Sequence, residues 1–272
     1  MPSVPVARCQ LHVERRGGGE PLLLIQGMGG NSAHWGDAFI RELEPDFDVI
    51  LYDHGGTGRS GPIDGDVTTT SLAGDARDLL DALGVGRAHV FGFSMGGMVA
   101  QELALDAPER VATLTLAGTS CGGTQSKATS AEVVSLLTSA VLSGDRERVL
   151  KTGFGVVFSA AFAADVANFG PFAEAARVHP ASLSTLLDHQ SAVVMHDAYG
   201  RMRGLAAPTL VVHGSEDRML EPVNGELIAS LAPGARLELL DGVGHLVFWE
   251  QPERVAALVR EHTAAQTAGP AV

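Results

Sequence analysis

A single serine lies among glycines in the stretch GFSMGG at residues 92–97. A serine hydroxyl attacks a carbonyl carbon when a histidine removes its proton and a carboxylate holds that histidine in place. Gly92, Ser94 and Gly96 match the pattern G-x-S-x-G, which in a strand–turn–helix setting exposes the hydroxyl on a very tight turn. The glycines leave room where backbone approaches too closely for side chains. We therefore predict that Ser94 is a nucleophile.

Two later positions could supply the carboxylate and the histidine. Asp217 comes soon after the apolar run PTLVVHG at 208–214, and His245 comes soon after ARLELLD at 235–241. In an α/β sheet, ligands bind beyond the carboxyl ends of the strands. The order serine, acid, histidine along the chain is also the order expected when a G-x-S-x-G turn carries the nucleophile. We predict that Asp217 orients His245 as the general base.

Other residues near these positions are rival candidates. Glu216 is an alternative acid beside Asp217, whereas Asp241 fits a turn residue better. His213 ends its own strand, and we interpret it as structural. His89 begins a strand and should lie at the opposite edge of the sheet. Asp217 therefore remains the preferred acid.

The negative charge that develops on an attacked carbonyl oxygen needs backbone N–H donors. Met95 directly follows the proposed nucleophile and should provide one N–H. The loop QGMGG at 26–30 follows another apolar run, and Met28 is the expected second donor. A plain glycine loop without a binding role is the alternative interpretation of this segment.

Apolar runs and helical spacing alternate along most of the chain, as in parallel sheets with helices on both faces. The apolar runs are residues 21–27, 47–53, 88–93, 111–118, 208–214 and 235–241. Between about 121 and 203 the pattern is mostly helical, with no clear strand. We therefore predict a mostly parallel, doubly wound α/β sheet formed by residues 1–120 and 204–272, with a helical cap at 121–203 that covers the site.

Composition excludes several classes of partner. The 272 residues include 19 basic and 32 acidic side chains, a net charge of −13, which disfavours binding to nucleic acid or to anionic membranes. The start of the chain lacks the apolar stretch of a signal peptide, and no apolar run is long enough to span a bilayer. We predict a cytoplasmic protein with no membrane partner and a small-molecule substrate.

Metal and nucleotide sites are also disfavoured by the sequence. Cys9 and Cys121 form no CxxC pair, and no Cys/His cluster has the spacing of a zinc site. The stretch GTGRSG at 56–61 matches G-x-G-x-x-G, but a dinucleotide site would need a helix to begin there. Gly61, Pro62 and Gly65 instead indicate a loop. We expect neither a cofactor nor a metal ion.

Five blocks then occur in order: QGMGG, LYDHGGTGRS, GFSMGG, HGSEDRM and GVGHLVFWEQPERV. Together they resemble the α/β-hydrolase-fold enzymes of the broad esterase, lactonase and haloperoxidase-like group, and the resemblance covers nearly the whole chain. It implies Ser94 as nucleophile, His245 as base and Asp217 as the orienting acid. It also implies Met28 and Met95 as oxyanion donors.

Two positions depart from the pattern of that group. Gln26 stands where the first block usually has histidine, and Gly55 stands where arginine is common. Neither departure changes the catalytic set, but both bear on loop packing and pocket polarity. Relatives that dehalogenate alkanes or open epoxides use aspartate as the nucleophile, so Ser94 disfavours those activities.

The sequence predicts a serine hydrolase that cleaves a small to medium, largely apolar carboxylic ester or lactone through an acyl-enzyme. The candidate pocket residues are Gln26, Phe154, Phe158, Met195 and Trp249. The cap phenylalanines could equally form the core of the cap itself. The same fold and triad could also serve C–C bond hydrolysis, cofactor-free oxygenation or perhydrolysis, or a biosynthetic lyase or cyclase step. A non-catalytic ligand-binding module is a further alternative. The sequence does not indicate an oligomeric state.

Overall fold

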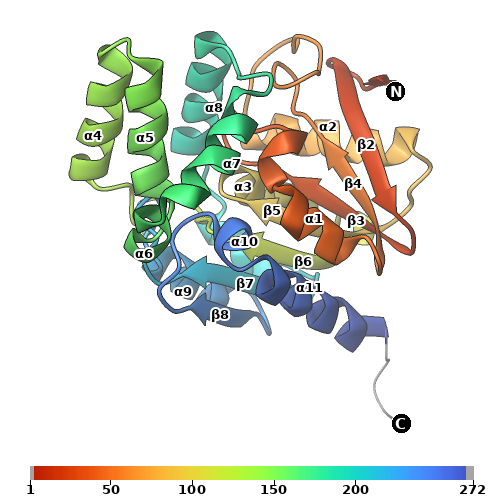
Figure 1. Ribbon diagram of the computed structural model, residues 1–272. Helices are drawn as coiled ribbons and strands as arrows, with labels where there is room; N and C mark the ends of the chain where they lie inside the picture. Colours follow the sequence, from red (N-terminus) through yellow and green to blue (C-terminus); the bar gives the residue numbers. More distant parts are fainter. Residues whose placement is uncertain (1–2, 268–272) are drawn as a thin grey trace.

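One eight-stranded sheet forms the centre of the computed structural model, which describes residues 3–267 (Figure 1). The strand order is β1-β2-β4-β3-β5-β6-β7-β8. Strands β3 to β8 pair in parallel, whereas β2 is antiparallel to both β1 and β4. The strands are β1 (Ser3–Pro5), β2 (Gln10–Gly17), β3 (Glu20–Ile25), β4 (Phe47–Tyr52), β5 (Ala88–Phe93), β6 (Val111–Ala117), β7 (Thr209–Gly214) and β8 (Arg236–Leu240). The predicted fold class is confirmed.

The central strands are continuous apolar runs because both faces of the sheet are covered. Every residue of β5 and β7 is buried. Along β3, Leu23 and Ile25 enter one core, and Leu22 and Leu24 enter the other. This alternation follows from the two-residue period of a strand. The sheet therefore separates two apolar layers.

Each layer is closed by its own helices (Figure 1). Helices α2 (Thr69–Ala82), α3 (Met95–Asp106) and α9 (Val223–Leu231) contribute to one core. Helices α1 (Asp37–Leu43), α10 (Val247–Glu250) and α11 (Pro252–Thr267) contribute to the other. Residues 3–267 also contain three short 3-10 helices, η1 (Ser32–Trp35), η2 (Pro108–Arg110) and η3 (Tyr199–Gly204). Alternating connections of this kind bring the carboxyl ends of the parallel strands to one edge.

Five consecutive helices, here called the helical insertion, lie between β6 and β7 and gather on one side of the molecule (Figure 1). They are α4 (Ala131–Leu142), α5 (Arg146–Val157), α6 (Ala160–Ala164), α7 (Val166–Arg177) and α8 (Leu183–Met195). Each begins at a serine or aspartate whose side chain accepts a backbone N–H of the first turn. These capping residues are Ser130, Asp145, Ser159, Asp165 and Ser182.

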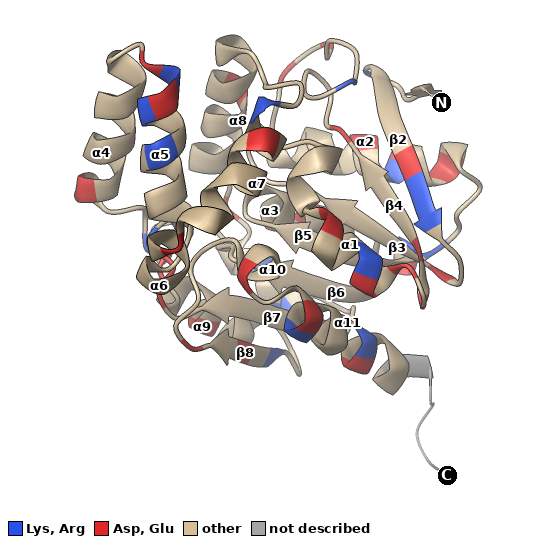
Figure 2. Ribbon diagram, in the orientation of Figure 1, with Lys and Arg blue, Asp and Glu red and all other residues tan. Residues whose placement is uncertain are grey.

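Two backbone contacts join the two ends of the segment that carries the insertion. Gly122 and Asp197 form an antiparallel bridge, in which the N–H of Ala198 donates to the carbonyl of Cys121 at 2.8 Å and the N–H of Gly123 donates to the carbonyl of His196 at 3.2 Å. The insertion therefore leaves and re-enters the core at almost one point. Charged side chains lie mainly on the outer helices, the β2 edge and the loops (Figure 2). In the part of the chain described, no helix is both long and apolar enough to cross a membrane.

Candidate active site

Ser94 occupies the turn between β5 and α3 in a backbone conformation that residues other than glycine rarely adopt. Its φ is 54° and its ψ is −121°. The turn is so tight that a Cβ at Gly96 would overlap the carbonyl oxygen of Ile25 in the neighbouring strand. A Cβ at Gly92 would lie 2.7 Å from that of Ala100 in α3. Strain of this kind persists only where the surroundings enforce it, and it is concentrated at functional sites.

Hydrogen bonds from the next strand enforce this conformation. The N–H of Ser94 donates to the carbonyl of Ala117 at the end of β6, at 3.0 Å. The hydroxyl of Thr119 donates to the carbonyl of Ser94 at 2.7 Å, and the N–H of Gly97 donates to the same oxygen at 2.9 Å. Both backbone polar groups of Ser94 are therefore satisfied, and its side chain is left half-exposed at the start of a helix.

Asp217 and His245 meet at the same edge of the sheet. Asp217 follows β7 and His245 follows β8, and His245 Nδ1 lies 2.7 Å from Asp217 Oδ2. The N–H groups of Met219 and Leu220 donate to Asp217 Oδ1 at 2.8 and 2.9 Å. Because Asp217 accepts hydrogen bonds on both oxygens, its position and that of the imidazole are fixed.

The carboxyl group of Asp217 remains ionised in this setting. Burial alone would raise its pKa, but electrostatic attraction to His245 and hydrogen bonds from His213 and His245 hold the pKa below its ordinary value. A carboxylate in contact with Nδ1 keeps the hydrogen on that atom, so Nε2 is free to accept a proton.

His213 makes a contact that the sequence did not reveal. Its Nε2 lies 3.1 Å from Asp217 Oδ2 and 2.7 Å from the carbonyl oxygen of Leu220. Since that carbonyl only accepts, Nε2 of His213 carries a hydrogen. The i, i+4 spacing of a strand-end histidine and the acid was the available signal. His213 thus contacts Asp217 at Oδ2, whereas the backbone donors bind Oδ1.

The alternative candidates Glu216, Asp241 and His89 contact residues outside the Asp217–His245 pair. Glu216 is exposed and accepts the N–H of Ala160 at 3.3 Å. Asp241 is exposed and lies 3.4 Å from the hydroxyl of Ser215. His89, at the start of β5, lies 2.9 Å from Glu20 Oε2. Asp217 is thus the acid that the geometry pairs with His245.

The segments that carry Phe93, Gly118 and His245 pack closely together beside Ser94. The rings of Phe93 and His245 have centroids 4.8 Å apart. A Cβ at Gly118 would lie 3.2 Å from Nδ1 of His245 and 3.3 Å from the Phe93 ring. Within residues 3–267 no hydrogen bond joins the Ser94 hydroxyl to the His245 ring.

The loop after β3 passes directly beside the serine. A Cβ at Gly27 would lie 3.1 Å from Cβ of Ser94. The N–H of Gly30 donates to the carbonyl of Gly27 at 3.1 Å, closing a turn that contains Met28. The side chain of Met28 is 39% exposed, whereas Met95 at the start of α3 is fully buried. We call residues 26–30 the β3–η1 loop.

The other candidate pocket residues occupy varied positions. Gln26 is buried, and its Oε1 accepts the N–H of Gly27 at 2.7 Å. Phe158 stacks on Phe162 with centroids 4.6 Å apart and meets Trp249 edge-on at 6.3 Å. Phe154, Phe162, Phe169 and Phe172 join this aromatic cluster. Met195 ends α8 with its side chain 74% exposed.

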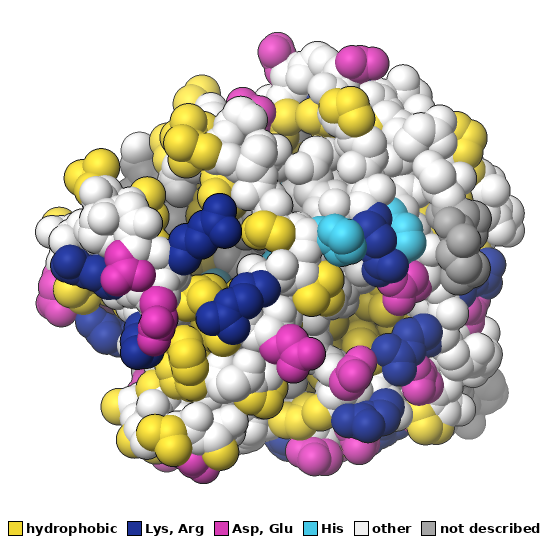
Figure 3. Space-filling model, turned by 45° about the horizontal axis from the view of Figure 1, so that its top comes forward, with side chains coloured by type: hydrophobic (Ala, Val, Ile, Leu, Met, Phe, Trp, Pro, Cys, Tyr) yellow, Lys and Arg dark blue, Asp and Glu magenta, His cyan; other side chains and the backbone are white. Residues whose placement is uncertain are grey.

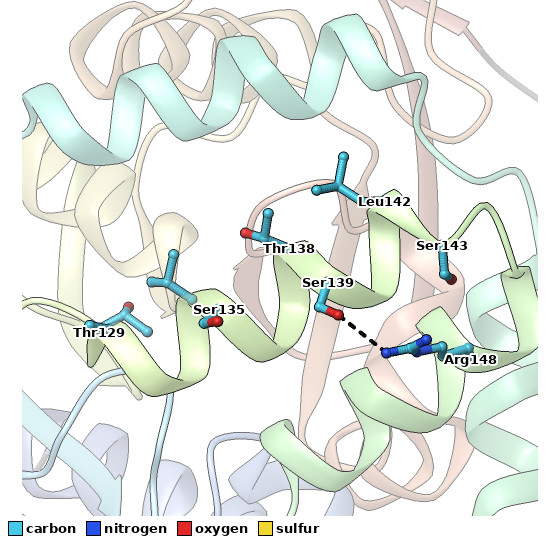
Figure 4. Close-up of a pocket in the computed structure, with 9 residues that line it drawn as sticks. Thr129, Ser135, Thr138, Ser139, Leu142, Ser143 and Arg148 are labelled. Carbon is cyan, nitrogen blue, oxygen red and sulfur yellow. Dashed lines mark hydrogen bonds between the residues drawn. The ribbon is translucent and has the colours of Figure 1, made fainter.

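Two hollows open near these elements. One of about 450 Å³ is lined by Phe158, Asp217 and Arg218 among others. The other, of about 740 Å³, runs along α4 and α5, where Thr138 and Leu142 extend away from α5 and Arg148 donates to Ser139 at 3.2 Å (Figure 4). Hydrophobic side chains gather around basic ones on the face that carries the insertion (Figure 3).

Known families and proteins match this arrangement. The model of the family described as "alpha/beta hydrolase fold" matches residues 20–252. The chain belongs to the α/β-hydrolase-fold family. This α/β hydrolase is 31% identical over 246 residues to the "Putative carbamate hydrolase RutD" of Azorhizobium caulinodans, covering 90% of this chain and 91% of that protein.

Two further proteins resemble this α/β hydrolase. The 2-hydroxy-6-oxononadienedioate/2-hydroxy-6-oxononatrienedioate hydrolase of Paraburkholderia xenovorans is 29% identical over 269 residues, covering 92% of this chain and 89% of that protein. The structure of a thermophilic esterase from Thermogutta terrifontis superposes with a TM-score of 0.80 at 25% identity, covering 97% of each chain. The chain is therefore an enzyme of the hydrolase class.

Proposed function

We propose that this α/β hydrolase is a serine hydrolase that cleaves a small to medium, largely apolar carboxylic ester or lactone through an acyl-enzyme. One observation carries the proposal. Ser94 is held at a positive φ at the carboxyl end of β5, on the same sheet edge as the Asp217–His245 pair. Strained serine, base and orienting acid are the three groups that acyl transfer to water needs.

In the first half-reaction, Nε2 of His245 removes the hydroxyl proton as Ser94 Oγ bonds to the carbonyl carbon. The N–H groups of Met28 and Met95 hold the resulting oxyanion. Collapse of the intermediate breaks the bond to the leaving oxygen, which takes the proton from His245. Water then attacks the acyl-enzyme, giving its proton to His245. The second collapse releases the acid, and the proton returns to Ser94.

The helical insertion suits the role of a cap over this site, with residues 121–203 as the cap and 1–120 and 204–272 as the core. The carbonyl of Val157, at the end of α5, accepts the N–H groups of His245 and Leu246 at 2.9 and 3.1 Å. The hydroxyl of Ser159 donates to Glu250 Oε2 at 2.6 Å. The proposed base is thus tied directly to the end of a cap helix, and the aromatic cluster at this junction would supply the apolar pocket.

An uncharged acyl substrate fits the residues that touch the nucleophile. Gly27, Phe93 and Thr119 lie against Ser94, and all are uncharged. The esterase neighbour supports an ester substrate. The relative named as a dienedioate hydrolase acts on a substrate with two carboxylates. Recognition of those carboxylates would need a cationic side chain, and Gly27, Phe93 and Thr119 supply none. A carbamate is a second candidate because of the RutD-like relative, since its carbonyl would undergo the same attack.

Replacement of Ser94 by alanine tests the proposal. Hydrolysis of a short p-nitrophenyl ester should fall by about 10⁴-fold or more, because the triad acts as a unit. Labelling by a fluorophosphonate should disappear while the melting temperature is retained. Ester turnover and labelling that both persist in S94A would show that another group is the nucleophile. A parallel screen of lactones and carbamates would define the acyl group.

A further inference from the structure

Helix α8 of the insertion reaches the β3–η1 loop through one buried histidine. The N–H of Gly29 donates to Nδ1 of His189 at 3.1 Å, although the two residues are 160 positions apart in sequence. His189 is 1% exposed. Gly29 is the neighbour of Met28, the proposed oxyanion donor, so this contact is one residue from the proposed chemistry.

The protonation of both rings at this loop follows from their partners. A backbone N–H only donates, so Nδ1 of His189 has a free lone pair and Nε2 carries the hydrogen. His54 is also 1% exposed, and its Nε2 lies 3.1 Å from the carbonyl oxygen of Gln26, which only accepts. The two rings meet edge-to-face with centroids 5.8 Å apart. One imidazole therefore holds the start of the loop, and the other holds its middle.

Burial keeps both rings neutral. It lowers the pKa of His189 to about 3, with a smaller contribution from His54. It also lowers the pKa of His54 to about 4, against the hydrogen bond to Gln26. A protonated His189 would present a hydrogen to the Gly29 N–H, so the contact requires the neutral ring. Both rings are therefore neutral near pH 7.

Other residues of the insertion contact the β3–η1 loop and the core segments beside it. Leu186 lies so near Gly29 that a Cβ there would overlap its side chain. The hydroxyl of Thr185 donates to the carbonyl of Gly56 at 3.2 Å. The amide of Asn31 donates to the carbonyl of Val178 at 2.8 Å. The insertion therefore packs against the core at Gly29 of the β3–η1 loop, at Asn31 just after that loop and at Gly56 in the loop that follows β4.

We propose that His189 is a positioning residue, which sets the direction of the Met28 N–H by fixing Gly29. Oxyanion donors act through their alignment, so a small displacement of the loop weakens transition-state binding more than substrate binding. The oxyanion site is then complete only while α8 rests on the loop. The inference depends on the proposed function, because it assigns Met28 to the oxyanion.

The test compares two replacements of similar size. In His189→Asn the side-chain oxygen can occupy the place of Nδ1 and accept the Gly29 N–H, whereas His189→Leu fills the space without an acceptor. We expect kcat for a p-nitrophenyl ester to fall about 10- to 100-fold in H189L with KM within about twofold, and H189N to recover most of the loss. The exposed Ser191→Ala on the same helix is the control and should match the wild type.

A boronic acid separates positioning from general structural damage, because it forms a tetrahedral adduct on the serine. Phenylboronic acid should inhibit H189L more weakly by the same factor as the loss in kcat/KM. Unchanged kcat in a folded H189L overturns the proposal. Equal losses in H189N and H189L, with a raised KM and unaltered boronate inhibition, overturn it as well.

A measurement on the unmodified protein covers the case in which H189L does not fold. Nitrogen-15 NMR of the histidine rings should show His189 as the Nε2–H tautomer, with the Gly29 amide protected from exchange. The Nδ1–H tautomer would overturn the proposal. Failure of the proposed function is separately visible, because it would appear as turnover in S94A whatever the His189 variants do.

Discussion

At the residue scale, the carboxylate of Asp217 is the most constrained group of the site. Two backbone N–H groups, His213 and His245 all donate to it. Each of its oxygens therefore has a defined role. Oδ1 holds the loop that follows β7, and Oδ2 holds the two imidazoles. A change of chemistry at this position should affect catalysis through the tautomer of His245 as well as through charge.

Asp217→Asn is expected to lower kcat for a p-nitrophenyl ester by about 10⁴-fold while the fold persists. The amide is nearly the same size, but its NH₂ group cannot accept the hydrogen on Nδ1 of His245. The ring then takes the other tautomer, in which Nδ1 accepts a hydrogen bond from the amide and Nε2 carries the hydrogen, so Nε2 cannot remove the proton of Ser94. Steady-state kinetics and the melting temperature check this. The exposed Glu216→Gln serves as control, and a loss larger in E216Q than in D217N would reverse the assignment of the acid.

The departure at Gly55 has a packing explanation. A Cβ there would lie 3.0 Å from Sγ of Cys9 and 3.0 Å from Cβ of Ile63, so a long side chain does not fit. Arg8 instead brings a guanidinium to within 3.5 Å of the buried carboxyl of Asp75. Burial nevertheless raises the pKa of Asp75 to about 6. Glycine at 55 thus leaves room for the side chains of Cys9 and Ile63.

At the element scale, the turn between β5 and α3 depends on glycine for space. Gly96→Ala should abolish folding or turnover, because its Cβ would overlap the Ile25 carbonyl in the adjacent strand. Gly153→Ala in α5 has nothing within 4 Å of the added Cβ and should stabilise the protein by roughly 0.5–1 kcal/mol. Urea denaturation and ester turnover measure both. Normal activity in G96A would mean that the turn relaxes freely.

The strands could be predicted from sequence, as could the positions of Ser94, Asp217 and His245 after strand ends, because local rules decide them. Buried parallel strands such as β5 and β7 are short apolar runs, and Ser94, Asp217 and His245 each follow one. The contacts of the insertion could not be predicted in this way. Nothing near His189 in sequence signals Gly29, since the contact depends on how α8 lies over a loop 160 residues earlier. The exposure of the Met195 side chain also depends on how α8 packs, which the residues near it in sequence do not indicate.

At the scale of the whole molecule, buried histidines couple the fold to pH. His54 and His189 have folded pKa values of about 4 and 3 against an ordinary 6.5, so only the unfolded chain binds their protons as pH falls below 6.5. Each such proton lowers stability by about 1.4 kcal/mol per pH unit. Asp75 acts in the opposite direction, because the folded state takes up its proton near pH 6 and the unfolded state only near 3.8.

The free energy of unfolding should therefore begin to fall below pH 6.5, well above the range in which surface carboxylates titrate. Between pH 6 and 4, His54 and His189 favour the unfolded state by two protons and Asp75 favours the folded state by one, so these three groups leave a net slope of about one proton. Burial also lowers the pKa values of His34 and His262, which adds to the decline. Asp75→Asn removes the opposing group and should steepen the decline, whereas His189→Asn should make it shallower. Urea midpoints from pH 7.5 to 4.5 measure all three proteins. A flat profile down to pH 4.5, or a steeper one in H189N, would show that the rings are not buried in their neutral form.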